Sequence, residues 1–248
     1  MRFQDKRIVV TGAGSGLGQA AAKGFAREGG KVLLVDINEA GLAATQRSIS
    51  ELGGVAKSMV VDLSTREACQ SVIAEAVSQL GGLDVLCNIA GVVRMCDVVA
   101  VSEQDWSALV ATNMAAPFWL SQAAIPHLLQ SHGNIVNCLS QSAHKGTAYV
   151  VPYSMTKGAV MMMTKSMAME FINEPIRINA VSPGAMTTGM SSLELPENMD
   201  VSLLMRYSGL RGPADPVDVA SMVLYVASDE ARVVHGAILC ADAGTTAD

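Results

Sequence analysis

Short apolar runs alternate along the chain with longer segments whose apolar positions recur at helical spacing. The runs predict about seven strands, at residues 6–10, 31–36, 56–61, 83–87, 133–139, 176–181 and 236–240. The segments between them predict helices at about 19–29, 39–52, 65–80, 103–131 and 216–228, and a further helix that carries Tyr153. Continuous apolar strands are typical of a parallel sheet covered by helices on both faces. The alternation predicts one α/β domain, residues 1–248, with a doubly wound parallel sheet.

Composition and charge narrow the class of protein. Half of the 248 residues are hydrophobic, only 4% are aromatic, and the formal net charge is −6. No basic run exceeds two residues, which argues against a nucleic-acid-binding surface. The polar N-terminus leads directly into a strand, and no apolar run has the length of a membrane span. We therefore expect neither a nucleic acid nor a membrane as a partner.

The cysteines carry no pattern of a metal or disulfide site. Cys69, Cys87, Cys96, Cys138 and Cys240 show no CxxC pairing, and three of them lie in apolar, strand-like runs. Buried cysteines in such runs behave as small apolar side chains. We interpret them as reduced thiols, and we expect a cytoplasmic protein without a metal site.

A glycine-rich turn follows the first predicted strand. The segment Thr11-Gly-Ala-Gly-Ser-Gly-Leu-Gly18 joins this strand to a helical pattern. Glycine permits a tight turn and the close approach of a pyrophosphate, and the following helix offers free N–H groups to the phosphates. Leu17 breaks the G-x-G-x-x-G spacing, whereas G-x-x-x-G-x-G fits from Gly12. Between a strand and a helix, this pattern predicts a dinucleotide site rather than a purely structural loop, which makes the expected fold Rossmann-like.

Asp36 ends the second predicted strand and bears on the choice of dinucleotide. A carboxylate there accepts hydrogen bonds from the adenosine ribose and repels a 2′-phosphate. Neither Ser15 nor Ile37 is an arginine that would neutralise such a phosphate. We therefore predict NAD(H) rather than NADP(H). Asp62 ends the next strand, and two interpretations stay open: it contacts the adenine edge together with the backbone of Leu63, or it opens the turn at Ser64.

Tyr153 and Lys157 are four residues apart in a helical segment. At this spacing two side chains share one helix face, with Cβ atoms about 5–6 Å apart. A free tyrosine has a pKa of about 10, and a neighbouring cation favours the phenolate. The pair therefore predicts a phenol whose pKa is low enough for general acid–base chemistry. Alone, the same spacing also fits an ordinary surface turn of a helix.

Together, these motifs resemble those of the short-chain dehydrogenase/reductase family. The resemblance is carried by the glycine-rich turn and by Asp62, Asn88-Ile-Ala-Gly91, Asn113, Ser140, Tyr153-Ser-Met-Thr-Lys157, Ser182-Pro-Gly184 and Leu239-Cys-Ala-Asp-Ala-Gly244. It covers nearly the whole chain, in order. The chain departs from the family pattern at Ile89, where a second Asn is usual, and at Cys138-Leu139, where Ile-Ser is common. Neither departure removes a catalytic group.

The resemblance implies a role for each matching residue. Tyr153 is expected to be the general acid–base, Lys157 to lower its pKa and hold the nicotinamide ribose, Ser140 to bind the substrate oxygen, and Asn113 to complete a proton relay. Asn113 also fits a second interpretation, a helix-bending residue bonded to a backbone carbonyl. The residues expected to bind the cofactor are Gly12, Gly14, Ser15, Gly16, Leu17, Gly18, Asp36, Ile37, Asp62, Leu63, Asn88, Ala90, Gly91, Tyr153, Lys157, Pro183, Gly184, Met186 and Thr188.

The substrate side is less constrained by the sequence. Ser140, Ser142, Tyr153 and Met190 are the expected substrate-binding residues, and Ser142 competes with Ser140 for the hydroxyl role. Ser140 has the family spacing and is preferred. The apolar segment 186–210 reads equally well as a lid over the substrate and as a packed helix pair without substrate contact.

The helix that follows Tyr153 and the long helix before it are apolar nearly all round, which indicates burial on more than one side. The resemblance implies that these two helices pair across one two-fold axis and that the C-terminal strand pairs across another, so that the chain forms a homotetramer. The predicted function is hydride transfer between NAD(H) and a secondary alcohol or ketone on a fairly apolar frame. Two alternatives stay open: an NADPH-dependent 3-oxoacyl-thioester reductase, and a non-catalytic dinucleotide-binding subunit.

Overall fold

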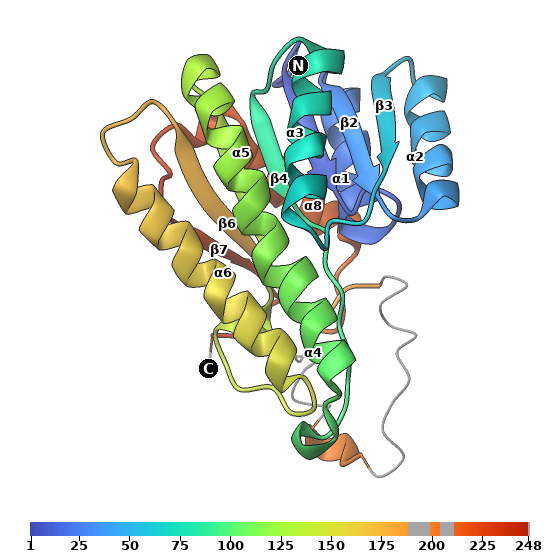
Figure 1. The fold of residues 1–248 in the computed structure, drawn as a ribbon, viewed down its shortest axis with the longest axis vertical. Helices are drawn as coiled ribbons and strands as arrows, with labels where there is room; N and C mark the ends of the chain where they lie inside the picture. Colours follow the sequence, from blue (N-terminus) through green and yellow to red (C-terminus); the bar gives the residue numbers. More distant parts are fainter. Residues whose placement is uncertain (188–198, 204–210, 248) are drawn as a thin grey trace.

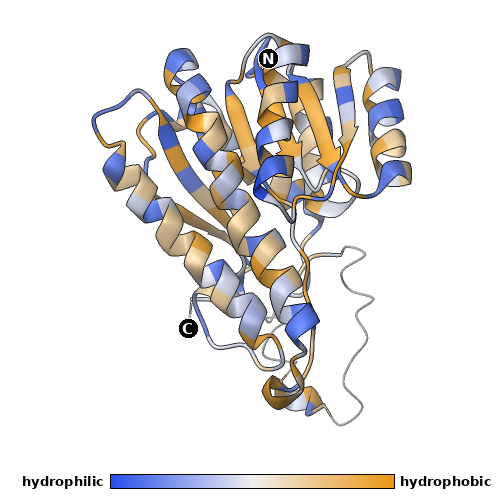
Figure 2. Cartoon of the chain, viewed as in Figure 1, coloured by the Kyte–Doolittle hydropathy of each residue, from blue (hydrophilic) through white to orange (hydrophobic). Residues whose placement is uncertain are grey.

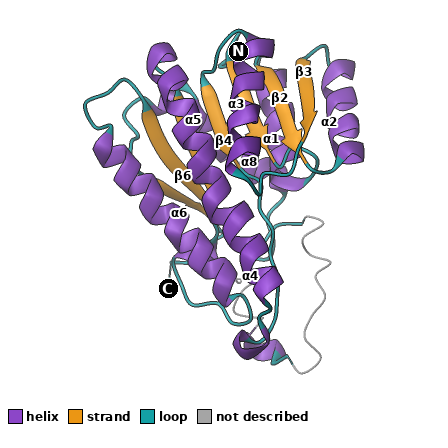
Figure 3. Ribbon diagram, viewed as in Figure 1, coloured by secondary structure: helices purple, strands orange, loops and turns teal. Residues whose placement is uncertain are grey.

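Most strands of the sheet are short apolar runs buried on both faces. The computed structural model describes residues 1–187, 199–203 and 211–247, and all structural statements refer to these residues. The strands are β1 (Arg7–Thr11), β2 (Lys31–Asp36), β3 (Val55–Val60), β4 (Val85–Asn88), β5 (Asn134–Cys138), β6 (Arg177–Pro183) and β7 (Ile238–Ala241). The α-helices are α1 (Gly16–Arg27), α2 (Glu39–Glu51), α3 (Arg66–Leu80), α4 (Glu103–Leu109), α5 (Ala116–Ser131), α6 (Val151–Glu170) and α8 (Pro216–Ala227) (Figure 3).

The strands form one parallel sheet in the order β3-β2-β1-β4-β5-β6-β7. Val9 of β1 lies beside Leu33 of β2 on one side and Leu86 of β4 on the other. The chain therefore winds outward from β1 to β3 and then crosses back to β4. In doubly wound sheets, ligands bind beyond the carboxyl ends of the strands at such a reversal. The seven-stranded parallel sheet predicted from the sequence is confirmed.

Helices cover both faces of the sheet, as Figure 1 shows. Alternate residues of β1 enter opposite cores, because successive strand side chains point to opposite faces. Ile8 packs in one cluster with Phe25 of α1 and Val223 of α8. Val9 packs in the other with Leu120 of α5, and α3 and α6 contribute to the same layer. Each fully buried aliphatic or aromatic side chain stabilises the fold by about 1.5–3 kcal/mol.

The single helix predicted over 103–131 is wrong in one respect, because it is interrupted. Residues Val110–Ala115 form a π-helical turn between α4 and α5. Pro117 lacks an N–H group, so it cannot donate to the carbonyl of Asn113 four residues earlier. The Asn113 side chain is also bonded to the backbone of Val92 instead of lying on a solvated face. Both features favour a wider local turn.

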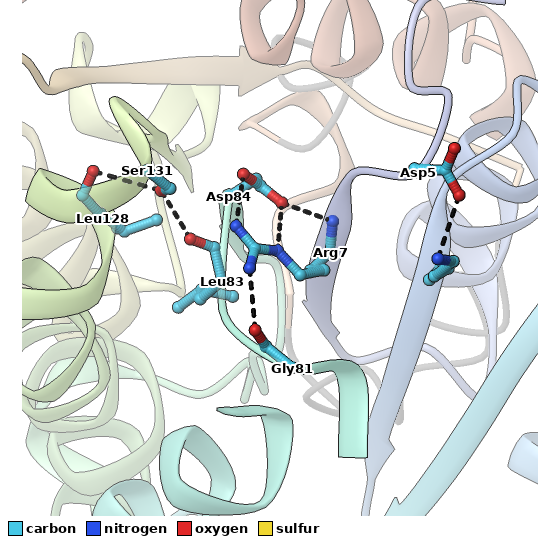
Figure 4. Close-up of polar contacts among 8 residues, drawn as sticks. Asp5, Arg7, Gly81, Leu83, Asp84, Leu128 and Ser131 are labelled. Atoms are coloured by element: carbon cyan, nitrogen blue, oxygen red, sulfur yellow. Dashed lines mark hydrogen bonds and ion pairs between the residues drawn. The ribbon is translucent and has the colours of Figure 1, made fainter. Parts of the chain in front are cut away.

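An ion pair joins the starts of β1 and β4, at the opposite end of the sheet from the reversal site. Arg7 Nε lies 2.7 Å from Asp84 Oδ2, and Arg7 Nη2 lies 3.0 Å from Asp84 Oδ1. The backbone N–H of Arg7 donates to the same carboxylate at 2.8 Å (Figure 4). The Asp84 side chain is only 10% exposed, so this pair is a structural anchor rather than a solvated surface contact.

Within the described residues, no helix is long and apolar enough to cross a membrane. The same residues contain no group of three or more His, Cys, Asp and Glu side chains arranged to hold a metal ion. All five cysteines are free thiols, and Cys69 and Cys87 are buried. Burial raises the pKa of the Cys69 thiol to about 11, which keeps it protonated and unreactive at neutral pH.

Candidate active site

The predicted site residues gather where β1, β4 and β5 end and where α1 and α6 begin. In Figure 1 the arrowheads of β2 and β3 point toward the half of the molecule that holds α4 and the first turn of α6. The glycine-rich turn follows β1, the Asn88 segment ends β4, and Ser140 follows β5. Parallel strands bring these ends to one edge of the sheet, so residues far apart in sequence become neighbours.

The glycine turn has a geometry that other residues would not tolerate. Gly12 and Gly16 have positive φ angles of 69° and 51°. A Cβ atom on Gly18 would lie 2.1 Å from the carbonyl oxygen of Gly12, and a Cβ on Gly14 would lie 3.0 Å from the Asp36 carboxyl group. Helix α1 begins at Gly16, three residues earlier than predicted. Its N-cap residue, Ser15, makes no side-chain capping bond, so N–H groups of the first turn are left for a ligand.

Asp36 bridges the glycine turn and the start of α2. Its Oδ2 accepts the Gly14 N–H at 2.9 Å, and its Oδ1 accepts the Asn38 N–H at 2.9 Å. The carboxylate is thus held at the end of β2, beside the turn, where the sequence prediction placed it. Ile37 is 67% exposed next to it. No described side chain forms an ion pair with Asp36, so its charge faces any group that enters this corner.

Thr11 opens the glycine motif but is not among the predicted site residues. Its Oγ1 accepts the N–H groups of Ile89 and Ala90, both at 3.0 Å, and donates to the Cys87 carbonyl at 3.3 Å. The hydroxyl therefore ties the glycine turn to the loop after β4. The signal for this role in the sequence is a threonine at the end of a strand, directly before a glycine motif. The sequence does not show that its bonding partner is the loop after β4.

Asn88 lies at the end of β4 and is 4% exposed. Its Nδ2 donates to Asn137 Oδ1 at 2.8 Å and to Ser121 Oγ at 3.2 Å. Asn137 in turn donates to Thr164 Oγ1 of α6 at 2.9 Å, which makes Asn137 a supporting residue that the sequence interpretation missed. Asn88 Oδ1 is buried without a hydrogen-bond partner among the described residues. A buried acceptor of this kind suits a ligand donor.

Asn113 and Lys157 flank the backbone of Gly91. A Cβ atom on Gly91 would lie 3.2 Å from Asn113 Oδ1 and 3.6 Å from Lys157 Nζ. Asn113 is fully buried, and its amide pairs with both backbone groups of Val92 at 2.8 Å. The interpretation of Asn113 as a helix-bending residue bonded to a backbone carbonyl is therefore correct as geometry. Asn113 also lies beside Lys157, as the proton relay requires, and its role in that relay stays a prediction.

Lys157 is anchored on the end of β5. Its Nζ donates to the carbonyl oxygen of Cys138 at 2.8 Å, and the ammonium is 5.7 Å from the centroid of the Tyr153 ring. The residue is only 4% exposed. Burying an ammonium costs free energy unless polar groups surround it. The Lys157 side chain therefore places a positive charge inside the site.

Tyr153 lies in the same cleft and is 8% exposed. Burial raises the pKa of the Tyr153 phenol above its ordinary value, and the Ser140 hydroxyl acts against this by hydrogen bonding. Among the protein's own groups burial dominates, so this pKa is raised although the sequence predicted that the neighbouring Lys157 would lower it. The phenol is therefore protonated at neutral pH unless a further positive charge adjoins it.

Ser140 and Ser142 stand side by side at the start of the short helix η3 (Gln141–Ala143). Ser140 Oγ accepts the Ser142 N–H at 3.3 Å, and the two hydroxyl oxygens are 3.4 Å apart. They are 5% and 4% exposed. The Ser140 hydroxyl also hydrogen-bonds the Tyr153 phenol, so Ser140 contacts both of the other hydroxyl groups. The structure thus brings both predicted serines to the site.

The remaining cofactor candidates have mixed outcomes. Asp62 is exposed, and its Oδ1 accepts the Ser64 N–H at 2.9 Å, so the turn-opening interpretation is correct; Leu63 is buried. Gly184 packs against Asp242, where a Cβ atom would lie 2.8 Å from the Asp242 Cα. Pro183 ends β6, and Met186 forms a β-bridge with Ala214. Thr188 and Met190 lie outside the described residues, as does most of segment 186–210.

These residues fit a nicotinamide dinucleotide. The glycine turn offers backbone N–H groups with no Cβ in the way, Asp36 offers a carboxylate at the ribose position, and Gly91, Lys157 and Tyr153 stand at the far end. A hollow of ≈ 370 Å³ opens beside the first turn of α1, between Gly16 and Thr187. The arrangement can bind an extended ligand along the carboxyl edge of the sheet and present a proton-transfer group at one end.

Comparisons with known proteins agree with this geometry. A family model described as enoyl-(acyl carrier protein) reductase matches residues 12–246. The chain is 36% identical over 244 residues to 2,5-dichloro-2,5-cyclohexadiene-1,4-diol dehydrogenase LinX of Sphingobium indicum, covering 98% of this chain and 97% of that protein. It is 34% identical over 245 residues to the 3-oxoacyl-[acyl-carrier-protein] reductase FabG of Thermotoga maritima, covering 98% and 99%. A short-chain dehydrogenase from Mycobacterium paratuberculosis, solved with NAD, superposes with a TM-score of 0.93 at 25% identity, and all of both chains is covered.

Proposed function

Because the chain belongs to the short-chain dehydrogenase/reductase family and is an oxidoreductase of alcohols and ketones, we propose that it uses NAD(H) and acts on a secondary alcohol or its ketone on a fairly apolar frame. The observation that carries this proposal is that Tyr153, the Ser140 hydroxyl that hydrogen-bonds it, and the Lys157 ammonium, 5.7 Å from the tyrosine ring, are buried together. A non-catalytic dinucleotide-binding subunit has no need of three such groups buried together.

The nicotinamide, when bound, accepts or delivers the hydride and carries a positive charge in its oxidised form. The protein's own groups handle the proton. In alcohol oxidation the Tyr153 oxygen takes the hydroxyl proton, and in ketone reduction it returns one. The Ser140 hydroxyl holds the substrate oxygen next to the phenol. Lys157, fixed by the Cys138 carbonyl, adds positive charge to the side of the phenol and stabilises the phenolate.

The proposal of NAD(H) rests on Asp36. Its carboxylate is fixed by the Gly14 and Asn38 N–H groups at the end of β2, where an adenosine ribose lies in doubly wound dinucleotide sites. A 2′-phosphate would place a negative charge next to the Asp36 carboxylate, and the repulsion between them favours a cofactor with a free ribose hydroxyl. Ile37 supplies no positive charge. This argument also speaks against the alternative of an NADPH-dependent 3-oxoacyl-thioester reductase, although one relative is named as a 3-oxoacyl-[acyl-carrier-protein] reductase.

The outer faces of α5 and α6 support a further part of the proposal, a homotetramer. These helices, with α4 and the π-helical turn that joins α4 to α5, expose large apolar side chains: Trp106, Met114, Phe118, Met155, Met162 and Met169. Figure 2 shows pale to orange residues along the visible side of α6. A face of this kind on two neighbouring helices fits pairing with a second copy. The five free thiols support a reducing compartment, and we place the protein in the cytoplasm.

The test of the function is a panel of secondary alcohols and ketones assayed with NAD(H) and NADP(H), with reduced nicotinamide followed by its absorbance. We expect turnover with NAD(H), and a loss of about 10²–10⁴-fold in kcat for Tyr153→Phe. Tyr225→Phe, on the exposed side of α8, is the matched control and keeps normal turnover. Near-normal turnover of Tyr153→Phe would contradict the proposed proton transfer.

A further inference from the structure

We propose that Ser142 is a second oxygen-binding group of the substrate site, and that the preferred substrates carry two oxygens on neighbouring carbons, as in a vicinal diol or an α-hydroxy ketone. This inference rests on the proposed function, because Ser140 and Tyr153 must hold the reacting oxygen. It assigns the two serines to two oxygens, instead of making them alternatives for one.

The spacing of the two hydroxyl groups is the first support. Ser140 Oγ and Ser142 Oγ are 3.4 Å apart, and the Ser142 N–H that donates to Ser140 Oγ at 3.3 Å fixes their relative position. Two gauche oxygens on neighbouring carbons lie about one hydrogen-bond length apart. A substrate whose first oxygen contacts Tyr153 and Ser140 therefore brings its second oxygen within reach of Ser142. Two oxygens on more distant carbons have no fixed short separation, so they do not match the spacing of the two serines.

Proton accounting is the second support. Each serine hydroxyl has one proton and can accept two bonds. Ser140 can donate to only one acceptor at a time, whether Ser142 Oγ, the Tyr153 oxygen or the substrate oxygen. When Ser140 donates to the substrate oxygen, the Ser142 hydroxyl, 4% exposed, has Ser140 Oγ as its neighbouring acceptor at 3.4 Å, which is longer than an ordinary O–H···O hydrogen bond. A second substrate oxygen at ordinary hydrogen-bond length would satisfy this buried hydroxyl better, and a poorly satisfied buried hydroxyl costs free energy.

The neighbouring walls define the rest of the substrate. Val93, Leu109 and Val150 pack around Tyr153, with Val92 and Met95 against them, so this side suits hydrocarbon. Two nearby cations have protein partners: Arg94 lies 3.4 Å from Asp105, and Lys145 donates to the Thr245 carbonyl at 2.8 Å. Besides the Lys157 ammonium, which the Cys138 carbonyl holds beside the phenol, the described residues of the cleft offer paired hydroxyl groups and apolar walls, which fits a neutral substrate with two oxygens better than a hydroxy acid.

The test compares matched pairs of probes: meso-2,3-butanediol with 2-butanol, and cyclohexane-1,2-diol with cyclohexanol. The wild-type protein should oxidise each diol with a higher kcat/KM than its monoalcohol. Ser142→Ala should lower kcat/KM for the diols by about 10- to 100-fold, mainly through KM, as expected for one or two lost hydrogen bonds. The same variant should leave the monoalcohols within about twofold. Ser142→Thr keeps a hydroxyl group and should restore part of the diol preference.

Each outcome separates the two proposals. Ser221→Ala, an exposed serine bonded to the Val217 carbonyl on α8, is the matched control and should leave all four rates unchanged. If Ser142→Ala lowers diol and monoalcohol rates by the same factor, or lowers neither, the second-oxygen site is refuted while the oxidoreductase stands. If the wild-type protein oxidises monoalcohols but neither diol, the second-oxygen site is likewise refuted. If it turns over no alcohol or ketone of the whole panel with either cofactor, the proposed function falls, and the role of Ser142 falls with it.

Discussion

The Lys157 ammonium of α6 donates to the backbone carbonyl oxygen of Cys138, the last residue of β5, at 2.8 Å. The backbone of the sheet thus holds the charge at its end, independently of the Cys138 side chain. From this anchor Nζ lies 5.7 Å from the centroid of the Tyr153 ring. The end of the sheet therefore fixes the position of the ammonium, and helix α6 carries both Tyr153 and Lys157.

This arrangement predicts a pH dependence. Burial raises the pKa of Tyr153, and a phenol with a raised pKa is protonated at neutral pH. Alcohol oxidation needs the phenolate, so kcat/KM for oxidation should rise with pH. Lys157→Met removes the charge that favours the phenolate, and its rising limb should move to higher pH, with a loss of about 10²-fold at neutral pH. Profiles of kcat/KM between about pH 6 and 11 check this.

Lys165→Met is the control for this experiment, since Lys165 is exposed on the same helix. It should reproduce the wild-type profile. A Lys157→Met profile that is lowered uniformly but not displaced would show that Lys157 only shapes the site and does not tune the phenol.

A second prediction concerns cofactor choice. Asp36→Ala combined with Ile37→Arg removes the carboxylate that Gly14 and Asn38 hold and adds a positive charge beside it. The ratio of kcat/KM for NAD⁺ to that for NADP⁺ should fall by about 10²-fold, the effect of about 3 kcal/mol. Glu39→Gln, an exposed acid in the first turn of α2, should leave the ratio unchanged. A wild-type preference for NADP⁺ would refute the NAD(H) proposal at the outset.

A third prediction concerns stability. Burial alone raises the pKa of Asp84, but the hydrogen bonds and charge of Arg7 outweigh it, so the pKa lies below its ordinary value. The ionised carboxylate therefore stabilises the folded state at pH values above the ordinary carboxyl pKa. This contribution is lost as the pH falls through the lowered value in the folded protein.

Asp84→Asn should accordingly lower the free energy of unfolding by about 2 kcal/mol at neutral pH, measured by urea denaturation. The difference from the wild type should shrink in acid. Asp5→Asn removes an exposed ion pair with Lys31 and should cost clearly less than Asp84→Asn, because solvent screens exposed charges. Equal costs for the two variants would contradict the anchoring role of Asp84.

A fourth prediction concerns assembly. Met162 is 56% exposed on the outer face of α6. If this face pairs with a second copy, Met162→Glu buries two charges at the interface and should convert tetramers into smaller species in sedimentation velocity at micromolar concentration. Leu52→Glu, at the end of α2 and 64% exposed, should leave the sedimentation coefficient unchanged. A wild-type protein that sediments as a monomer would refute the tetramer.

Much of the architecture could be predicted because it depends on local patterns. The run Lys31–Asp36 was recognised as a strand from its apolar residues, with the same bounds that the structure has. The glycine turn between Thr11 and Gly18 predicted a backbone that binds a ligand. Only glycine fits at position 18, because a Cβ atom there would clash with the Gly12 carbonyl oxygen. Such features rest on residue type and spacing, and both are visible in the chain itself.

Other features depend on which segments meet in space. The sequence contained Thr11, Asn137 and Cys138, but not the facts that Thr11 binds the backbone of Ile89, that Asn137 supports Asn88, or that the Cys138 carbonyl holds Lys157. Pro117 was visible near the interruption of the long helix, but the contact of Asn113 with the backbone of Val92 was not. Residue type and spacing along this chain established the sheet, the dinucleotide turn and the Tyr153–Lys157 pair. The acidity of the phenol and the pairing of Ser140 with Ser142 depended on folding, because desolvation and hydrogen bonding arise only when distant segments exclude water together.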